Sequence, residues 1–143
     1  MKKEVLIAIV GLQFEINEDE ALEVISPGEY YFRNGKHYVL YEELTEDEGG
    51  IKGGITKNTL KFSGDAVELR KSGFNNVVMT FEKGKKTMTC YQTPVGNLMI
   101  GIDTNSVTVT ELQEGIVVDI RYTLDINYNH VSECVIKIKI VER

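Results

Sequence analysis

The chain has 143 residues, and its 16 Lys and Arg against 22 Asp and Glu give a formal net charge of −6. This length predicts one domain, residues 1–143, which can bury a core without disulfides or metals to hold it together. Binding to nucleic acid or to an acidic membrane surface depends on a basic face, which this acidic composition disfavours. We therefore expect no nucleic acid and no membrane among the partners.

An apolar run from Val5 to Leu12 follows the first basic residues. It is too short to span a bilayer, and no small-residue cleavage site of a signal peptide precedes Gln13. We interpret it as the first strand, from about Glu4 to Ile16, and expect a cytoplasmic protein. Because the run is apolar on both faces, we expect it to be buried on both sides or to cover a contact with another molecule. A homodimer is one candidate.

The acidic segment Asn17–Glu20 has two interpretations. It can cap a short helix, or it can turn a hairpin into a strand from Leu22 to Ile25, which the β pattern downstream favours. Pro27-Gly28 then predicts a bulge or a sharp bend in an edge strand.

Asn34-Gly35 is a strong hairpin signal, because both residues adopt positive φ readily. It predicts a hairpin formed by residues 29–33 and 36–44. Residues 45–54 combine an acidic run with two Gly-Gly pairs and predict an exposed loop between strands. A mobile flap over one end of the fold is the alternative.

Gly64-Asp65 predicts a second hairpin with a two-residue turn, in which the glycine provides a positive φ. Alternation of side chains then places the apolar residues on one face and the charged residues on the other. The predicted cross-strand partners are Ser63 with Ala66, Phe62 with Val67, Lys61 with Glu68, Leu60 with Leu69, and Thr59 with Arg70.

Lys83-Gly84 predicts a third hairpin by the same counting. Its expected pairs include Phe81 with Lys86, Met79 with Met88, and Val77 with Cys90. One face would be apolar and consist of Val77, Met79, Phe81, Met88 and Cys90. The opposite face would hold Val78, Thr80, Thr87, Thr89 and Tyr91.

Further strands are predicted at residues 96–103, 107–112, 116–126 and 131–141, and the last two alternate clearly between apolar and polar residues. The total of about nine or ten strands, joined mostly by short turns and without a long helix, indicates an antiparallel β protein. A barrel closed on itself is the economical arrangement because it removes exposed strand edges.

Cys90 and Cys134 both lie on predicted strand faces with apolar neighbours, which favours buried free thiols over a disulfide or a metal pair. His37 and His130 have no metal-ligand spacing with each other or with acidic residues. No cofactor and no metal are expected.

Several short motifs, in this order and spacing, resemble a known family over essentially the whole chain. They are Gly28-Glu29-Tyr30-Tyr31, Tyr41-Glu42-Glu43, Thr59-Leu60-Lys61, the segment 67–73, and Tyr91 with Gly96. This pattern is similar to the YwiB-like family of small bacterial proteins. The resemblance implies a calycin-like barrel of the lipocalin type and carries over no activity and no catalytic residue. With the strand pattern, the expected fold class is all-β, a single antiparallel up-and-down, calycin- or lipocalin-like β-barrel of about 8–10 strands.

The candidate ligand-binding residues are Arg70, Tyr91, Glu42, Tyr122 and Thr93. A guanidinium at a barrel mouth could clamp a carboxylate or phosphate, whereas the alternative for Arg70 is the solvated face of a hairpin with an ion pair. Glu42 and its neighbour Glu43 are either a possible acid or base or exposed strand-end residues. The hydroxyl groups of the other three could line a cavity, although such residues are also good strand formers. No nucleophile elbow or triad is recognisable, so no catalytic residue is assigned.

Three functions follow from this pattern. The favoured one is non-enzymatic binding of a small-molecule ligand inside the barrel. The second is an interaction module with a filled barrel, whose outer wall at the first strand binds a protein partner or a second copy. An enzyme with a polar pocket around Arg70 and Glu42 has the least support. An open polar pocket would favour the first function, and a packed interior the second.

Overall fold

The computed structural model describes residues 3–11, 23–45, 47, 49–50, 52–73, 76–93 and 96–143, without the side chains of Val24, Thr45, Tyr91, Gln92, Thr93, Val131 and Ser132. The strands are β1 (Lys3–Val10), β2 (Glu23–Arg33), β3 (Lys36–Thr45), β4 (Gly54–Phe62), β5 (Ala66–Gly73), β6 (Val77–Glu82), β7 (Lys86–Thr93), β8 (Gly96–Glu111), β9 (Gly115–Ile126) and β10 (Asn129–Glu142). In these ranges no helix is long and apolar enough to cross a membrane. The expected end of the first strand at Ile16 and the segment 17–22 lie outside the described residues.

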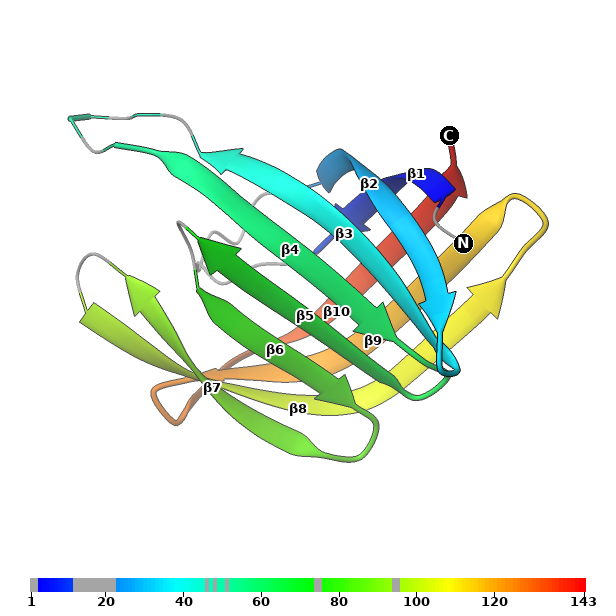
Figure 1. The fold of residues 1–143 in the computed structure, drawn as a ribbon. Helices are drawn as coiled ribbons and strands as arrows, with labels where there is room; N and C mark the ends of the chain where they lie inside the picture. The colour runs from blue at the N-terminus through cyan, green and yellow to red at the C-terminus, as the bar shows by residue number, and fades with distance from the viewer. Residues whose placement is uncertain are drawn as a thin grey trace.

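The ten strands form one antiparallel sheet in the order β6-β5-β4-β3-β2-β1-β10-β9-β8-β7, which wraps into a nearly closed barrel (Figure 1). The first and last strands pair with each other, from Val5 with Glu142 to Val10 with Lys137. The predicted all-β antiparallel barrel is confirmed. Figure 1 also shows the two ends of the barrel: the turns at 34–35, 64–65 and 83–84 gather at one end, which we call the turn end, and the β3–β4 hairpin projects at the other, the arm end.

The core consists of the side chains on the inner face of the barrel, that is, of every second residue of each strand. Every second residue of β1, Val5, Ile7 and Ile9, is buried, while Leu6 between them is 36% exposed. The same pattern in the other strands fills the barrel with apolar side chains. One cavity lined by apolar residues of β1, β4, β5, β6, β9 and β10 has a volume of about 10 Å³, which is no more than the space of one water molecule.

Two predicted hairpins are confirmed in register. Asn34 and Gly35 have φ values of 53° and 75°, and Arg33 pairs with Lys36. In the second hairpin the ladder runs from Phe62 with Val67 to Thr59 with Arg70 as expected. The predicted positive φ at Gly64 is wrong, because this glycine is absent from the positive-φ residues. Burial of the alternating apolar side chains is sufficient to hold this register whatever the turn type.

The predicted pairing of the third hairpin is wrong. The described residues of β6 and β7 share no ladder beyond the turn, although the Thr87 hydroxyl donates to the Thr80 carbonyl at 2.8 Å. Because β7 takes its register from β8, Thr87 lies opposite Ile102 and faces inward. Met88 and Cys90 consequently point outward, and the expected burial of Cys90 is wrong.

Two interruptions of strands that we expected from the sequence also differ from those in the structure. Residues 96–103 and 107–112 belong to one strand, β8, which passes a bulge between Thr104 and Ser106. Of the two alternatives at Pro27-Gly28, the bulge does not occur, because β2 keeps an unbroken register with β1 from Tyr30 to Glu23. Pro27 does lie at a local edge, since the ladder of β2 with β3 ends at Gly28.

Gly28 gives the first testable prediction. A Cβ atom at this position would lie 2.8 Å from the Leu40 carbonyl oxygen, whereas a Cβ at Gly64 would meet nothing within 4 Å. We expect Gly28→Ala to lower the free energy of unfolding by about 2 kcal/mol, because backbone must move to relieve the contact. Gly64→Ala is the matched control and should change it by less than about 0.5 kcal/mol. Urea unfolding of the two variants measures both values, and equal stabilities would contradict this account of the approach of β2 to β3.

Candidate functional site

The barrel wall opens between β2 and β3. Their ladder extends only from Arg33 with Lys36 to Gly28 with Tyr41. Beyond it, residues 23–27 of β2 pair with β1 alone, and residues 42–45 of β3 pair with β4 alone. Pro27 lies at this point of separation and has no N–H to donate to a neighbouring strand. The Ser26 hydroxyl lies 3.1 Å from the Pro27 carbonyl and reaches across the opening to within 3.3 Å of the Glu42 carbonyl.

A cavity of about 630 Å³ lies at this opening, which we call the β2–β3 cavity. Residues of both faces of the wall line it. From the outer face come Glu29, Glu42 and Lys57, and from the inner face Tyr41 and Asn58. This volume is within the range of about 300–1,000 Å³ that is usual for small-molecule sites.

A polar cluster continues from this cavity along the inner face of β3, β4 and β5. Tyr41 lies directly opposite Asn58, and Asn58 lies opposite Lys71. The Lys71 ammonium donates to Glu43 Oε1 at 2.6 Å, with side-chain exposures of 10% and 28%. An ion pair this far from water depends strongly on keeping both partners, because either charge alone would be poorly solvated.

Two polar atoms of this cluster have no hydrogen-bond partner among the described residues: the Tyr41 hydroxyl and Asn58 Oδ1. Both side chains are buried, with exposures of 4% and 2%. Burial, assisted by the charge of Glu43, raises the pKa of Tyr41 well above its usual value, so its hydroxyl keeps its proton. A buried polar group without a partner costs about 1–3 kcal/mol. Both groups therefore keep unused hydrogen-bonding capacity in the interior of the wall.

The candidate residues predicted from the sequence do not come together. Glu42 lines the β2–β3 cavity. Arg70 lies on the outer face, 60% exposed, with Nη2 3.5 Å from Glu68 Oε1, and it is not among the residues that line the cavity. Its surroundings are those of a solvated hairpin face.

Tyr122 is buried on the inner face of β9, where its ring packs edge-on against Phe81 at 5.1 Å between centroids. Burial is the main cause that raises the pKa of Tyr122, and the neighbouring Cys134 is a smaller cause in the same direction. The backbones of Tyr91 and Thr93 belong to β7 and pair with Leu98 and Gly96. The side chains of these two residues lie outside the described part of the structure.

Sequence reasoning missed Asn58 and Lys71. The signal was present in the hairpin register: one step beyond the pair of Thr59 and Arg70 lies the pair of Asn58 and Lys71, on the same face as Leu60. A period of two places neighbours on opposite faces, so choosing Arg70 selected the outer side of the wall. In the same way, Glu42 and its neighbour Glu43 face opposite sides of the wall.

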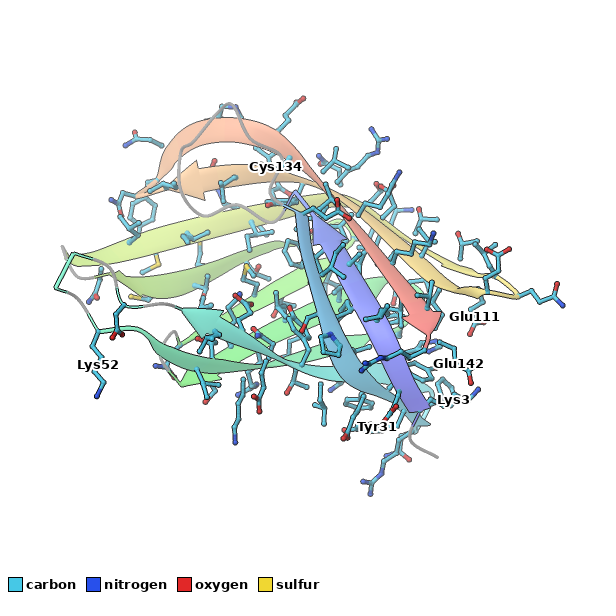
Figure 2. The ribbon with its side chains drawn as sticks, turned by 90° about the horizontal axis from the view of Figure 1, so that it is seen from above. Lys3, Tyr31, Lys52, Glu111, Cys134 and Glu142 are labelled. Carbon is cyan, nitrogen blue, oxygen red and sulfur yellow. The ribbon has the colours of Figure 1, made fainter. Side chains whose placement is uncertain are left out.

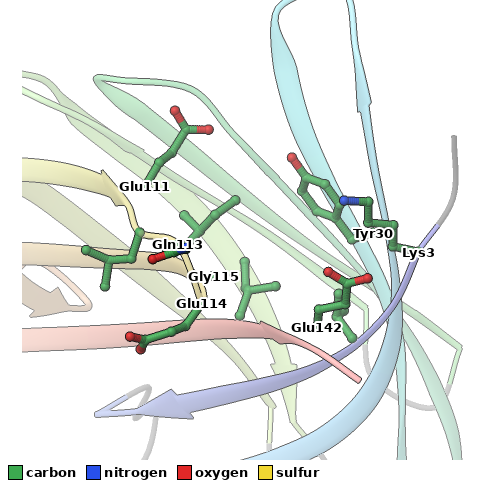
Figure 3. A pocket seen from close by; sticks show the side chains of 11 residues that line it. Lys3, Tyr30, Glu111, Gln113, Glu114, Gly115 and Glu142 are labelled. Atoms are coloured by element: carbon green, nitrogen blue, oxygen red, sulfur yellow. The ribbon is translucent and has the colours of Figure 1, made fainter.

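The turn end holds a second, smaller pocket of about 210 Å³. Figure 2 shows Lys3, Glu111 and Glu142 together at this end and Lys52 at the other. In Figure 3, Lys3, Tyr30 and Glu142 lie on one side of the pocket and Glu111 on the other. Its polar lining comes largely from exposed side chains.

His37 adjoins this pocket as a buried residue. Its ring stacks on Phe62 at 4.7 Å between centroids, Nδ1 is 2.7 Å from the Tyr30 hydroxyl, and Nε2 is 3.7 Å from Glu111 Oε1. Burial lowers the pKa of His37, against the smaller opposing effect of the Glu111 charge. Among the described residues, no group of three or more His, Cys, Asp or Glu side chains could hold a metal ion.

The fold and its cavities define an antiparallel, nearly closed ten-stranded β-barrel with a polar opening in its wall. Residues 7–138 match the model of a family described as a domain of unknown function, DUF1934, and the chain belongs to this family. The crystal structure of the ywiB protein from Bacillus subtilis has the same fold: the TM-score is 0.75 at 20% identity, over 99% of this chain and 93% of that chain. No curated protein matches the sequence.

The inner ion pair gives a second prediction. Glu43→Gln leaves the ammonium group of Lys71, the less exposed partner, without a counter-charge, and we expect a loss of about 2 kcal/mol in the free energy of unfolding. Lys71→Met should cost less, about 1 kcal/mol, because Glu43 is closer to water. The double variant Lys71→Met/Glu43→Gln should lose less stability than the sum of the two single losses. Urea unfolding of all three, with the exposed Arg70→Gln as control, measures the coupling; additive losses would contradict a buried pair.

His37 gives a third prediction, for pH dependence. Its pKa is lowered in the folded state, so the unfolded chain takes up a proton first as the pH falls through about 6.5. The free energy of unfolding should therefore decrease between about pH 7 and pH 5, and His37→Gln should remove part of that decrease. Urea unfolding across this pH range tests it. His130→Gln, at an exposed histidine, should keep the wild-type slope; a His37→Gln slope equal to the wild type would refute the assignment.

Proposed function

We propose that the protein binds a small polar ligand in the β2–β3 cavity, without catalysing a reaction on it. One observation carries this proposal: the cavity is lined by Tyr41 and Asn58, whose buried hydroxyl and amide oxygen have no partner among the described residues. The cavity has the size of a ligand site. The described cavity among the apolar core residues, of about 10 Å³, is too small for a ligand, whereas the β2–β3 cavity in the wall is not.

Native mass spectrometry of protein purified gently from its source tests this proposal. We expect a small molecule retained at one per chain. Tyr41→Phe removes the hydroxyl group without changing the ring, and retention should fall about tenfold, the equivalent of one hydrogen bond. The unliganded variant should be as stable as the wild type, because it no longer buries a polar atom without a partner.

Tyr38→Phe is the matched control. Tyr38 belongs to the same strand but lies on the outer face, where its ring stacks on Tyr31 at 4.8 Å between centroids. Retention should be unchanged in this variant. A wild-type protein that carries no ligand, or equal retention by Tyr41→Phe, would count against the proposal.

Self-association through the outer face of β1 is a second candidate function. The observation that favours it is an apolar area on the outer wall, where Leu6 lies opposite Pro27 and the neighbouring Ile25 is 63% exposed. Apolar side chains on adjacent strands are suited to contact a second copy of the same face. The same native mass spectrum would show this as a species of twice the chain mass.

A further inference from the structure

Three sulfur-bearing side chains share the outer face of the hairpin formed by β7 and β8, at one end of the sheet (Figure 1). Met88 and Cys90 are two residues apart in β7, and Met99 of β8 lies directly opposite Cys90. The other sulfur-bearing residues that the structure describes, Met79 and Cys134, belong to the core or pack against it. We call Met88, Cys90 and Met99 the sulfur cluster.

Packing in the core does not account for the sulfur cluster, because its members face outward. Met88 is 44% exposed, and Cys90 is an exposed free thiol. Met99 is partly buried, while its neighbour Ile100 points into the core and is fully buried. Cysteine is among the residues most often buried, and an exposed thiol is open to oxidation and disulfide exchange. The position of these sulfur atoms on the surface therefore indicates a role outside the core.

The spacing of the sulfur cluster allows all three sulfur atoms to contact one ion. Residues directly opposite each other in an antiparallel ladder have Cβ atoms about 4.5–5.5 Å apart, and diagonal neighbours are about 7–8 Å apart. Cys90 and Met99 are an opposite pair, and Met88 and Met99 are diagonal neighbours. A methionine side chain is unbranched and has three rotatable bonds, so its sulfur atom can adjust over such distances.

Gly101 leaves room for the Met88 side chain above β8. It lies opposite Met88, and a Cβ atom at this glycine would be 3.1 Å from Met88 Sδ. The thioether of Met88 therefore extends over β8, the strand that carries Met99, instead of pointing away from it. A larger residue at position 101 would compete with the thioether for this space.

The chemistry of the sulfur cluster favours a soft, monovalent ion. Thiolate and thioether sulfur atoms are ligands that select Cu(I), whereas carboxylate and carbonyl oxygens suit harder ions. Cys90 would bind as a thiolate, and its proton would pass to the solvent as the sulfur–copper bond forms. The single negative charge of the thiolate then balances the single positive charge of Cu(I). Lys86, on the same face of β7, is neutralised by Asp125 at 2.6 Å.

We propose that Met88, Cys90 and Met99 form a binding site for one Cu(I) ion. This site is separate from the β2–β3 cavity, and it gives the protein a metal-binding function in addition to the proposed one. Because the cluster lies on the outer wall, the ion can bind and leave without any opening of the barrel.

Anaerobic titration of the full chain with Cu(I), in competition with the chromogenic chelator bicinchoninate, tests the proposal. We expect one Cu(I) to bind per chain. Cys90→Ser should weaken binding about 100-fold, since even a residue that only orients a metal ligand contributes about 10–100-fold to affinity. The double variant Met88→Leu/Met99→Leu keeps the thiol and nearly the same side-chain volume, and it should weaken binding at least about tenfold.

Cys134→Ser is the matched control, because it removes the other thiol, which lies opposite Tyr122 in the ladder of β9 and β10. It should bind Cu(I) with the wild-type affinity. Methyl NMR gives a second readout: the methyl resonances of Met88 and Met99 should shift when Cu(I) binds, and that of Met79, in the core, should not.

Three results would overturn the proposal. Equal affinity of the wild type and Met88→Leu/Met99→Leu would show an adventitious ion on a lone thiol. Loss of binding in Cys134→Ser would place the ion elsewhere. Native mass spectra with one Cu(I) shared by two chains would show that a single chain does not complete the site.

Discussion

The alternation of side chains across the barrel wall is the constraint on which the rest of the structure depends. Burial of one apolar row per strand, such as Val5, Ile7 and Ile9 in β1, fixes the register of each ladder, because a slip of one residue would turn the whole row toward water. Once the register is fixed, every polar residue is assigned to one side of the wall. Lys71 enters the interior and Arg70 does not for this reason alone.

The sequence was sufficient to predict the structure where local turn and strand patterns determine it. Asn34-Gly35 and the alternation around Gly64 predicted two hairpins with correct partners, and the pattern of short strands predicted the barrel. It was insufficient to predict pairing where two different strands compete for the same partner. β7 follows β6 closely in the chain, yet its register comes from β8, and no count from the turn at Lys83 could show that preference. Of the predicted site residues, Glu42 lines the β2–β3 cavity, and Arg70 is the outward-facing neighbour of Lys71.

The β2–β3 cavity could not be predicted for a related reason. It results from the relation between β2 and two partners, β1 and β3, whose ladders with β2 overlap only between Gly28 and Tyr30. Pro27 predicted a bulge or a sharp bend in an edge strand, but a missing N–H does not reveal which neighbouring strand is absent. The unpaired buried atoms of Tyr41 and Asn58 depend on the same long-range geometry.

The open seam between β6 and β7 has a consequence for chain connectivity. The two ends of the sheet are consecutive in sequence, while β1 and β10 are paired and the Arg143 amide donates to the Glu4 carbonyl at 2.9 Å. A circular permutant cut between Lys83 and Gly84, with the original ends joined by a short linker, would therefore pass from β7 to β6 through the sheet without skipping a neighbour. Every ladder would be preserved, and the seam would become the place where the chain begins and ends.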